Sequence, residues 1–204
     1  MRKERKEAAK RLYEMAEGQQ GFFTTKQAKA AGFAENTHPY HVQAGNWIRE
    51  HRGIYRLASF PQGERPDLML WSLWSRNREE VAQGVYSHQT ALSLHELSDV
   101  MPAKLHMTVP RSFRRNSKIP RVLVLHFADL PQSEIGTAHG VGVTKPMRTI
   151  LDLLAGGEVP SATLRQAVRE GLRRGLIRRG EIAEARKRLA DSKQLRNLFQ
   201  KVAA

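Results

Sequence analysis

Glycines and one capping pattern divide the first sixty residues into short segments, and this division most constrains the fold. Gly18, Gly32 and Gly45 each follow a segment with helical spacing of apolar residues, and glycine commonly ends a helix because it adopts left-handed backbone angles without strain. Thr24, followed three residues later by Gln27, has the spacing of a capping box at a helix start. Only short elements fit between these signals.

These signals predict three helices and a hairpin. The expected helices and strands cover residues 3–17, 25–31, 36–44, 47–49 and 54–57. Pro39 is tolerated in the third helix because it falls in the first turn, where a missing N–H costs little. Three helices followed by a hairpin are typical of a winged helix, whose second and third helices form a helix-turn-helix.

The remainder of the chain mixes strands and helices. Helices are expected at 67–82 and 88–97, strands at 85–87, 105–109, 122–127 and 137–143, and further helices at 146–155, 161–175, 179–190 and 192–202. The Pro- and Gly-containing segment 61–66 has the composition of a linker. We therefore expect a winged helix over 1–60 and a mixed α/β domain with a helical C-terminus over 67–204, so the expected fold class is α+β / α/β.

The charge balance favours a polyanionic partner. The chain has 34 Lys and Arg against 20 Asp and Glu, a formal net charge of +14. The net charge is +5 for residues 1–60, +2 for 61–130 and +7 for 131–204. Each Lys or Arg that docks on a phosphate releases a condensed counterion, so a basic surface gains affinity for nucleic acid without reading its sequence. A soluble basic protein without such a partner is the alternative.

The expected third helix separates two sets of side chains. His38, His41 and Val42 fall on one stripe, where a His usually packs against the core. The opposite side carries residue types that suit the edges of bases in the major groove, namely Asn36, Thr37, Tyr40 and Gln43. We predict that this second set faces DNA, with a half-buried core position for Tyr40 as the alternative.

Basic residues surround the expected wing. Arg49, His51, Arg52 and Arg56 lie on or next to the hairpin, and a wing of this kind normally lies along phosphates or the adjacent minor groove. Lys26, at the start of the second helix, is placed for a further phosphate. Each of these residues alone is also compatible with an ordinary solvated surface charge.

The C-terminal helices carry arginines at helical spacing. They are Arg165, Arg169, Arg173, Arg174, Arg178 and Arg179. Two interpretations remain open for them: a second phosphate-binding patch that contacts DNA or RNA, or a solvated helix face.

Several patterns begin like catalytic motifs without completing them. His95-Glu96 starts like a zinc-protease helix, but no second His follows four residues later. Arg148 and Asp152 lie four residues apart on an expected helix, which favours an ion pair over a catalytic couple. We therefore expect no enzyme activity, no catalytic residue, no bound metal and no cofactor.

The composition also bears on location. The chain has no Cys, so neither disulfides nor Cys-bearing zinc sites support the fold. The N-terminal sequence MRKERKEAAKRL is charged and has no apolar stretch, so we expect neither a signal peptide nor a membrane span. A cytoplasmic location is the default expectation.

Three blocks of sequence carry a family resemblance. The first runs from Gly32 to Leu57 and ends in Arg-Gly-Ile-Tyr-Arg-Leu. The second runs from Ser87 to Pro110 and contains Ser-His-Gln-Thr-Ala-Leu-Ser-Leu-His-Glu-Leu and Met-Thr-Val-Pro. The third, residues 144–153, is Thr-Lys-Pro-Met-Arg-Thr-Ile-Leu-Asp-Leu. In this order the blocks resemble AbiEi-type antitoxins of type IV toxin–antitoxin systems, except that Met147 stands where the family often has an acidic residue.

The resemblance implies a regulator that binds operator repeats in double-stranded DNA and represses its own operon. It also implies a C-terminal domain that neutralises a nucleotidyltransferase-like AbiEii toxin, the product associated with abortive infection, without forming a stable complex with it. Two other functions remain open from the residues: a stand-alone winged-helix transcription factor with a ligand-sensing domain, and a nucleic-acid-cleaving enzyme. A nuclease would need clustered carboxylates for Mg²⁺, and none is visible in the sequence.

Overall fold

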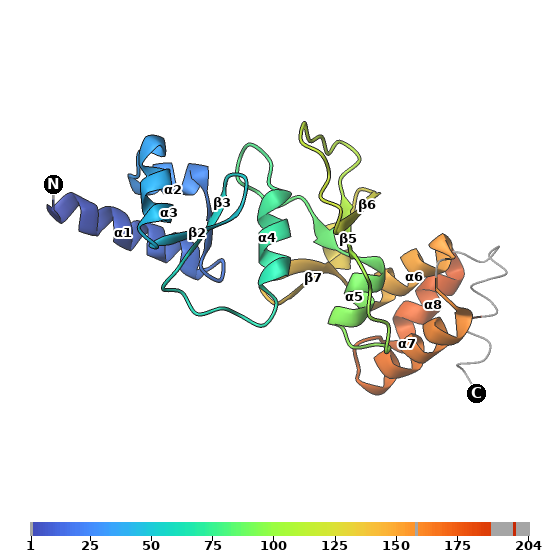
Figure 1. The fold of residues 1–204 in the computed structure, drawn as a ribbon. Coiled ribbons are helices and arrows are strands. Elements are labelled where there is room, and N and C mark those ends of the chain that lie inside the picture. The colour runs from blue at the N-terminus through green and yellow to red at the C-terminus, as the bar shows by residue number, and fades with distance from the viewer. Residues whose placement is uncertain (1, 158, 189–197, 199–204) are drawn as a thin grey trace. The chain divides into compact units, whose positions relative to one another are not determined.

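The computed structural model describes residues 2–157, 159–188 and 198, and the chain divides into two compact units (Figure 1). The first unit comprises Met1–Gln83 together with His139–Val141, and the second comprises Gly84–Ala138 and Gly142–Ala204. The expected fold class is confirmed, because helices and mixed sheets follow an N-terminal winged helix.

The first unit has the order of elements that defines a winged helix. Its elements are α1 (Arg2–Glu17), β1 (Phe22–Thr24), α2 (Thr25–Ala31), the 3₁₀ turn η1 (Glu35–Thr37), α3 (His38–Gln43), β2 (Trp47–His51), β3 (Ile54–Leu57) and α4 (Pro66–Trp74). The strands form an antiparallel sheet in the order β1-β3-β2. The short strand β1, which the sequence analysis missed, places β3 at the centre of this sheet.

Local signals position α2 and α3. The capping box is present, since the Thr24 hydroxyl accepts from Gln27 N and the Gln27 side chain accepts from Thr24 N. Gly32 ends α2 with a φ of 109°. The third helix begins at His38 rather than at residue 36, because Pro39 has no N–H to donate to the carbonyl of Glu35, and the preceding residues form a 3₁₀ turn instead.

The first unit extends further along the chain than the expected linker. Helix α4 ends at Trp74 rather than at residue 82 and packs on β1 and β3. The Ser75 hydroxyl donates to Ser72 O at 2.7 Å, and a turn closed by Asn77 follows. The boundary between the compact units therefore falls after Gln83 rather than within 61–66.

The second unit is built on a mixed sheet in the order β6-β5-β4-β8-β7. Its strands are β4 (Val85–Tyr86), β5 (Leu105–Val109), β6 (Leu123–Phe127), β7 (Ile135–Ala138) and β8 (Val141–Thr144), and the 3₁₀ turn η2 is Gln132–Glu134. Strand β4 is antiparallel to β5 and parallel to β8, and β5 is parallel to β6. The single strand expected over 137–143 is thus two strands, because Gly140, with a φ of 76°, forms a turn between them.

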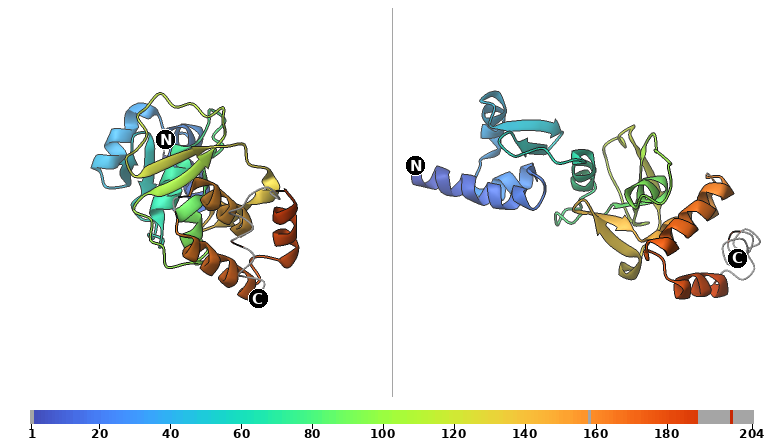
Figure 2. Two further views of the ribbon diagram at one scale, coloured as in Figure 1. Left: turned by 90° about the vertical axis from the view of Figure 1, so that its right-hand side faces the viewer. Right: turned by 90° about the horizontal axis from the view of Figure 1, so that it is seen from below.

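Helices supply most of the second unit's apolar core. They are α5 (His88–Leu94), α6 (Pro146–Gly156), α7 (Ser161–Arg173) and α8 (Arg179–Arg188), and α6 packs against both α5 and α7 (Figure 2). Leu92, Ile150, Leu153, Leu164 and Val168 are all at most 2% exposed in this core. The helix expected over 192–202 lies outside the described residues. No helix in the described part of the chain has the length and apolarity needed to cross a membrane.

Candidate nucleic-acid interface

The inner side of α3 packs on a cluster of aromatic rings. His38 is 2% exposed, and its ring meets Trp47 and Tyr55 edge to face at 5.2 and 5.8 Å. His41 stacks on Trp47 with a centroid distance of 4.5 Å. Burial, with the charges of His38 and Arg5 nearby, lowers the pKa of His41. The packing role expected for both histidines is confirmed, and the lowered pKa disfavours a positive charge on His41.

The outer side of α3 presents polar groups to solvent. Tyr40 is 66% exposed, so the half-buried alternative for this ring is wrong. Gln43 and Asn36 are also exposed. Thr37 is only partly exposed, and its hydroxyl donates to Ala34 O at 2.6 Å. The structure therefore leaves Tyr40, Gln43 and Asn36 as the accessible groups on this face.

The wing is a short hairpin with a fixed tip. Arg52 and Gly53 connect β2 to β3, and Gly53 has a φ of 73°, a conformation that favours glycine. Gly53 O accepts from Thr25 N at 3.0 Å, so the tip is tied to the start of α2. Arg49 and Arg52 are exposed on this hairpin and carry the charge that the sequence analysis assigned to the wing.

Two other predicted wing contacts are partly buried. Arg56 Nε donates to Glu50 Oε1 at 2.8 Å, and the Arg56 side chain is 11% exposed. This departs from the expected exposed position because Arg56 lies on the central strand β3, flanked by Phe22 and Ile48. The ring of His51 packs edge to face on Trp71 at 5.4 Å. Both residues are only partly exposed, so they are less accessible than Arg49 and Arg52.

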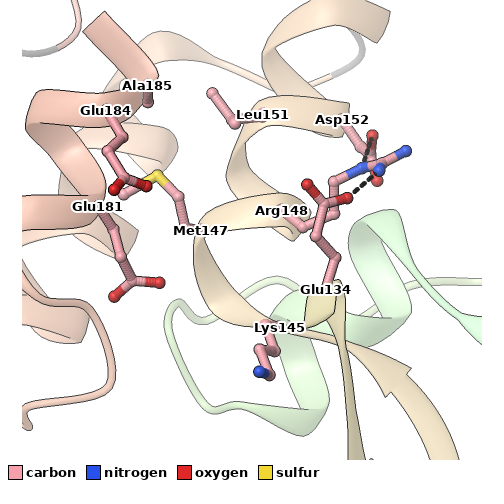
Figure 3. A pocket seen from close by; sticks show the side chains of 9 residues that line it. All are labelled: Glu134, Lys145, Met147, Arg148, Leu151, Asp152, Glu181, Glu184 and Ala185. Atoms are coloured by element: carbon pink, nitrogen blue, oxygen red, sulfur yellow. Dashed lines mark hydrogen bonds and ion pairs between the residues drawn. The ribbon is translucent and has the colours of Figure 1, made fainter. Parts of the chain in front are cut away.

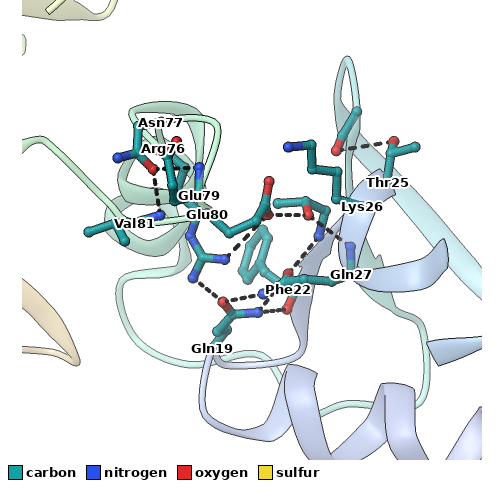
Figure 4. A network of polar contacts seen from close by, with 12 residues as sticks. Gln19, Phe22, Thr25, Lys26, Gln27, Arg76, Asn77, Glu79, Glu80 and Val81 are labelled. Atoms are coloured by element: carbon teal, nitrogen blue, oxygen red, sulfur yellow. Dashed lines mark hydrogen bonds and ion pairs between the residues drawn. The ribbon is translucent and has the colours of Figure 1, made fainter. Parts of the chain in front are cut away.

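A polar network holds the start of α2 against the segment that follows α4 (Figure 4). The Thr24 hydroxyl donates to Glu80 Oε2 at 2.7 Å, and Arg76 donates to Gln19 and pairs with Glu80. Exposed Lys26 donates to the carbonyl of Arg78 at 2.7 Å. The network fixes the start of α2 on the segment that follows α4. A phosphate contact by Lys26 would compete with its hydrogen bond to the carbonyl of Arg78.

The side chains of two of the six C-terminal arginines make ion pairs or hydrogen bonds within the second unit. Arg173 pairs with Glu170, with Nε to Oε2 at 2.9 Å. Arg174 donates to the carbonyls of His95 and Glu96 at 2.9 and 3.1 Å, which satisfies acceptors at the C-terminal end of α5. Exposed Arg169, Arg178 and Arg179 and partly exposed Arg165 make up the rest of the predicted set.

A cavity of about 480 Å³ lies between α6 and α8 in the second unit (Figure 3). Arg148 Nε donates to Asp152 Oδ1 at 2.8 Å, which confirms the expected pair, and Arg148 also pairs with Glu134. Glu181 and Glu184 line the opposite wall. In the described part of the chain, no group of three or more His, Asp or Glu has an arrangement that could hold a metal ion.

The fold defines the first unit as a winged-helix module, and α3 has a polar, exposed outer face. Residues 10–58 of this module match the family model described as transcriptional regulator, AbiEi antitoxin. This match confirms the family resemblance over that segment and supports transcriptional regulation as the general kind of function. The blocks at 87–110 and 144–153 lie outside the match.

The chain is also similar to solved structures, and one of them matches over nearly the whole chain. It is the RV2827C protein from Mycobacterium tuberculosis, with a TM-score of 0.54 and 14% sequence identity over 95% of this chain and 71% of that chain. At this identity the likeness concerns the fold alone. No curated protein sequence matches the chain.

Proposed function

We propose that this protein is a DNA-binding transcriptional autorepressor and the antitoxin of a type IV, AbiE-like toxin–antitoxin system. The observation that carries the DNA-binding part is the exposed Tyr40 and Gln43 on α3 beside exposed Arg49 and Arg52 on the wing. Amide and hydroxyl groups read base edges, whereas arginines bind phosphates. The family match over residues 10–58 supports the same assignment.

The two parts of the chain have separate roles in this proposal. The first unit, up to residue 83, grips operator repeats in double-stranded DNA, and the second unit, from residue 84 onward, forms a non-catalytic effector domain in the cytoplasm. The effector domain neutralises a nucleotidyltransferase-like toxin without a stable complex. Because α4 and the Arg76–Glu80 segment pack on the winged helix, a fragment made to test the DNA-binding part ends at residue 83.

A second candidate function is a regulator that senses a small ligand. The cavity between α6 and α8 favours it, because its walls combine charged side chains, including Lys145, with the apolar side chains of Met147 and Leu151. Rescue of toxin-expressing cells separates the two functions: the antitoxin restores growth, whereas a ligand-sensing regulator leaves growth arrested.

Alanine at Gln43 or Tyr40 is expected to lower discrimination between operator and random DNA by about 1–3 kcal/mol. The reason is that each side chain is exposed on the outer face of α3 and loses base contacts without disturbing the core. Competition gel shifts with both DNAs measure the difference. Ala44→Gly, at an exposed position that ends the same helix, serves as the control. Equal losses of affinity on both DNAs would exclude these residues as readers.

Glutamine at both Arg49 and Arg52 is expected to weaken binding uniformly across sequences. The slope of log affinity against log salt concentration falls by about one unit for each phosphate contact removed. Binding titrations at several salt concentrations measure this slope. Lys3→Gln with Lys6→Gln, two exposed charges on α1, is the matched control. An unchanged slope in the Arg49/Arg52 variant would remove the wing from the interface.

A further inference from the structure

The connection between β5 and β6 is the least explained segment of the second unit. These strands are parallel neighbours, paired from Leu105 with Leu123 to Val109 with Phe127. A parallel pair needs a crossover, which is usually an amphipathic helix that covers the sheet. Residues 110–122, all of which the structure describes, instead form neither helix nor strand. We call this segment the β5–β6 loop. In Figure 1 it runs out from the sheet as the yellow-green connection.

The β5–β6 loop carries a high density of positive charge. From Val100 to Ala128 the sequence contains no Asp or Glu. The same stretch contains Lys104, Arg111, Arg114, Arg115, Lys118 and Arg121. The net charge of residues 61–130 is only +2, because acidic residues, most of them at 64–99, offset these positive charges. The net value therefore does not reveal that the basic residues are grouped apart from the acidic ones. A connection of about this length without helix or strand is uncommon inside a compact domain and is usually either functional or disordered.

Hydrogen bonds and one buried ring fix the base of the loop. Phe113 is 5% exposed, and its N–H donates to Pro110 O at 2.9 Å. Arg114 Nη1 donates to Arg111 O and Phe113 O at 2.9 and 2.8 Å. Asp129 Oδ1 accepts from the N–H of Arg111 at 3.1 Å. Arg114 therefore stabilises the turn, while the exposed side chains of Arg111, Lys118 and Arg121 extend from an ordered base.

Apolar side chains are exposed among these charges. Ile119 is 49% exposed within the loop, and Phe127 is 53% exposed at the end of β6, opposite Val109 where the loop begins. Spaced cations with one aromatic ring suit the phosphates and sugars of a nucleic-acid backbone. Single-stranded RNA is usually bound by several aromatic rings that stack on unpaired bases. The β5–β6 loop region exposes one such ring, which favours a duplex backbone.

We propose that the β5–β6 loop is a second contact with duplex DNA, made through the phosphate backbone and without reading sequence. This inference rests on the proposed DNA-binding function and lengthens the footprint beyond the winged helix. Because both units belong to one chain, binding by one raises the effective concentration of DNA at the other. The loop therefore contributes affinity and salt dependence, whereas α3 contributes specificity.

The test uses the full chain and a long random-sequence duplex, with affinity measured at several salt concentrations. The variant Arg111→Gln/Lys118→Gln/Arg121→Gln is expected to lower the log–log salt slope by about two to three units, since each phosphate contact accounts for about 0.9. The control Arg169→Gln/Arg178→Gln/Arg179→Gln removes the same charge from exposed positions on α7, on α8 and just before α8 in the same unit and is expected to leave the slope nearly unchanged. Lys118→Glu repeats the test without altering the turn at 110–114, in case the triple variant folds poorly.

The outcomes separate this proposal from the function of the winged helix. The loop variant is measured again in the Arg49→Gln/Arg52→Gln background, where the same fall in slope supports an independent contact. If only the loop variant lowers the slope and the wing variant does not, the loop proposal stands and the winged-helix interface fails. An unchanged slope in both loop variants, or an equal fall in the control, overturns the loop proposal. A loss of affinity for duplex or single-stranded RNA but not for duplex DNA overturns it as well.

Discussion

Replacing Trp47 by alanine is expected to lower the free energy of unfolding by about 3–5 kcal/mol, the usual cost of truncating a large buried aromatic side chain. Trp47 is 4% exposed at the start of β2. Its ring lies within 4.5–5.8 Å, between centroids, of the rings of Phe23, Phe33, His38, His41 and Tyr55. The substitution leaves a cavity beneath α3, so specific DNA binding is lost along with stability.

Urea unfolding followed by near- and far-ultraviolet circular dichroism measures this loss. Ile48→Ala, on the same strand but 38% exposed, is the control and is expected to cost less than about 1 kcal/mol, because most surface substitutions have small effects. A similar small loss for Trp47→Ala would show that α3 is held by something other than this aromatic cluster.

Acidification is expected to destabilise the second unit through His88. Its ring stacks on His126 with a centroid distance of 3.5 Å, and His126 Nε2 lies 3.0 Å from His106 Nδ1. Burial, with charges on His126, His106 and Arg148 nearby, lowers the pKa of His88 from 6.5 to about 3. Between pH 6.5 and pH 3, His88 therefore binds a proton in the unfolded chain but not in the folded chain. The free energy of unfolding is therefore unaffected by His88 at neutral pH and decreases as the pH falls from 6.5 towards 3.

The size of the effect follows from the same linkage. Between pH 7 and pH 4, His88 contributes a loss of about 1–2 kcal/mol, because one pKa unit corresponds to about 1.4 kcal/mol and solvent screens this partly exposed ring. His88 has a φ of 50°, and Asn tolerates this left-handed conformation best among nonglycine residues. His88→Asn is therefore expected to flatten the dependence of the unfolding free energy on pH.

Denaturation curves collected from pH 7 to pH 4 provide the measurement. His139→Asn is a matched control, because His139 has a φ of 49° and is exposed in the turn between β7 and β8. That variant is expected to keep the wild-type pH dependence. If His88→Asn also keeps it, the acid sensitivity arises elsewhere, and the buried neutral state of His88 is not its cause.

The placement of α2 and α3 was predictable because their signals are local. Thr24 and Gln27 satisfy each other's backbone groups three residues apart, and Gly32 ends the same helix with a left-handed backbone. The spacing of His38 and His41 against Tyr40 and Gln43 predicted which side of α3 is buried. The pair Arg148–Asp152 follows from the same helical geometry, since residues four apart are neighbours on a helix surface.

The sequence by itself thus determined the winged-helix order, the caps of α2 and the outward face of α3, because each depends on residues within one or two turns of one another.

Only the tertiary structure decided which charged side chains remain exposed. Arg56 pairs with Glu50 because β1 makes β3 a central strand, and Arg174 is held by carbonyls at His95 and Glu96, far away in sequence. Arg111, Lys118 and Arg121 stay exposed because the crossover from β5 to β6 contains no helix. Such partners are set by long-range chain packing, which local periodicity and spacing do not encode.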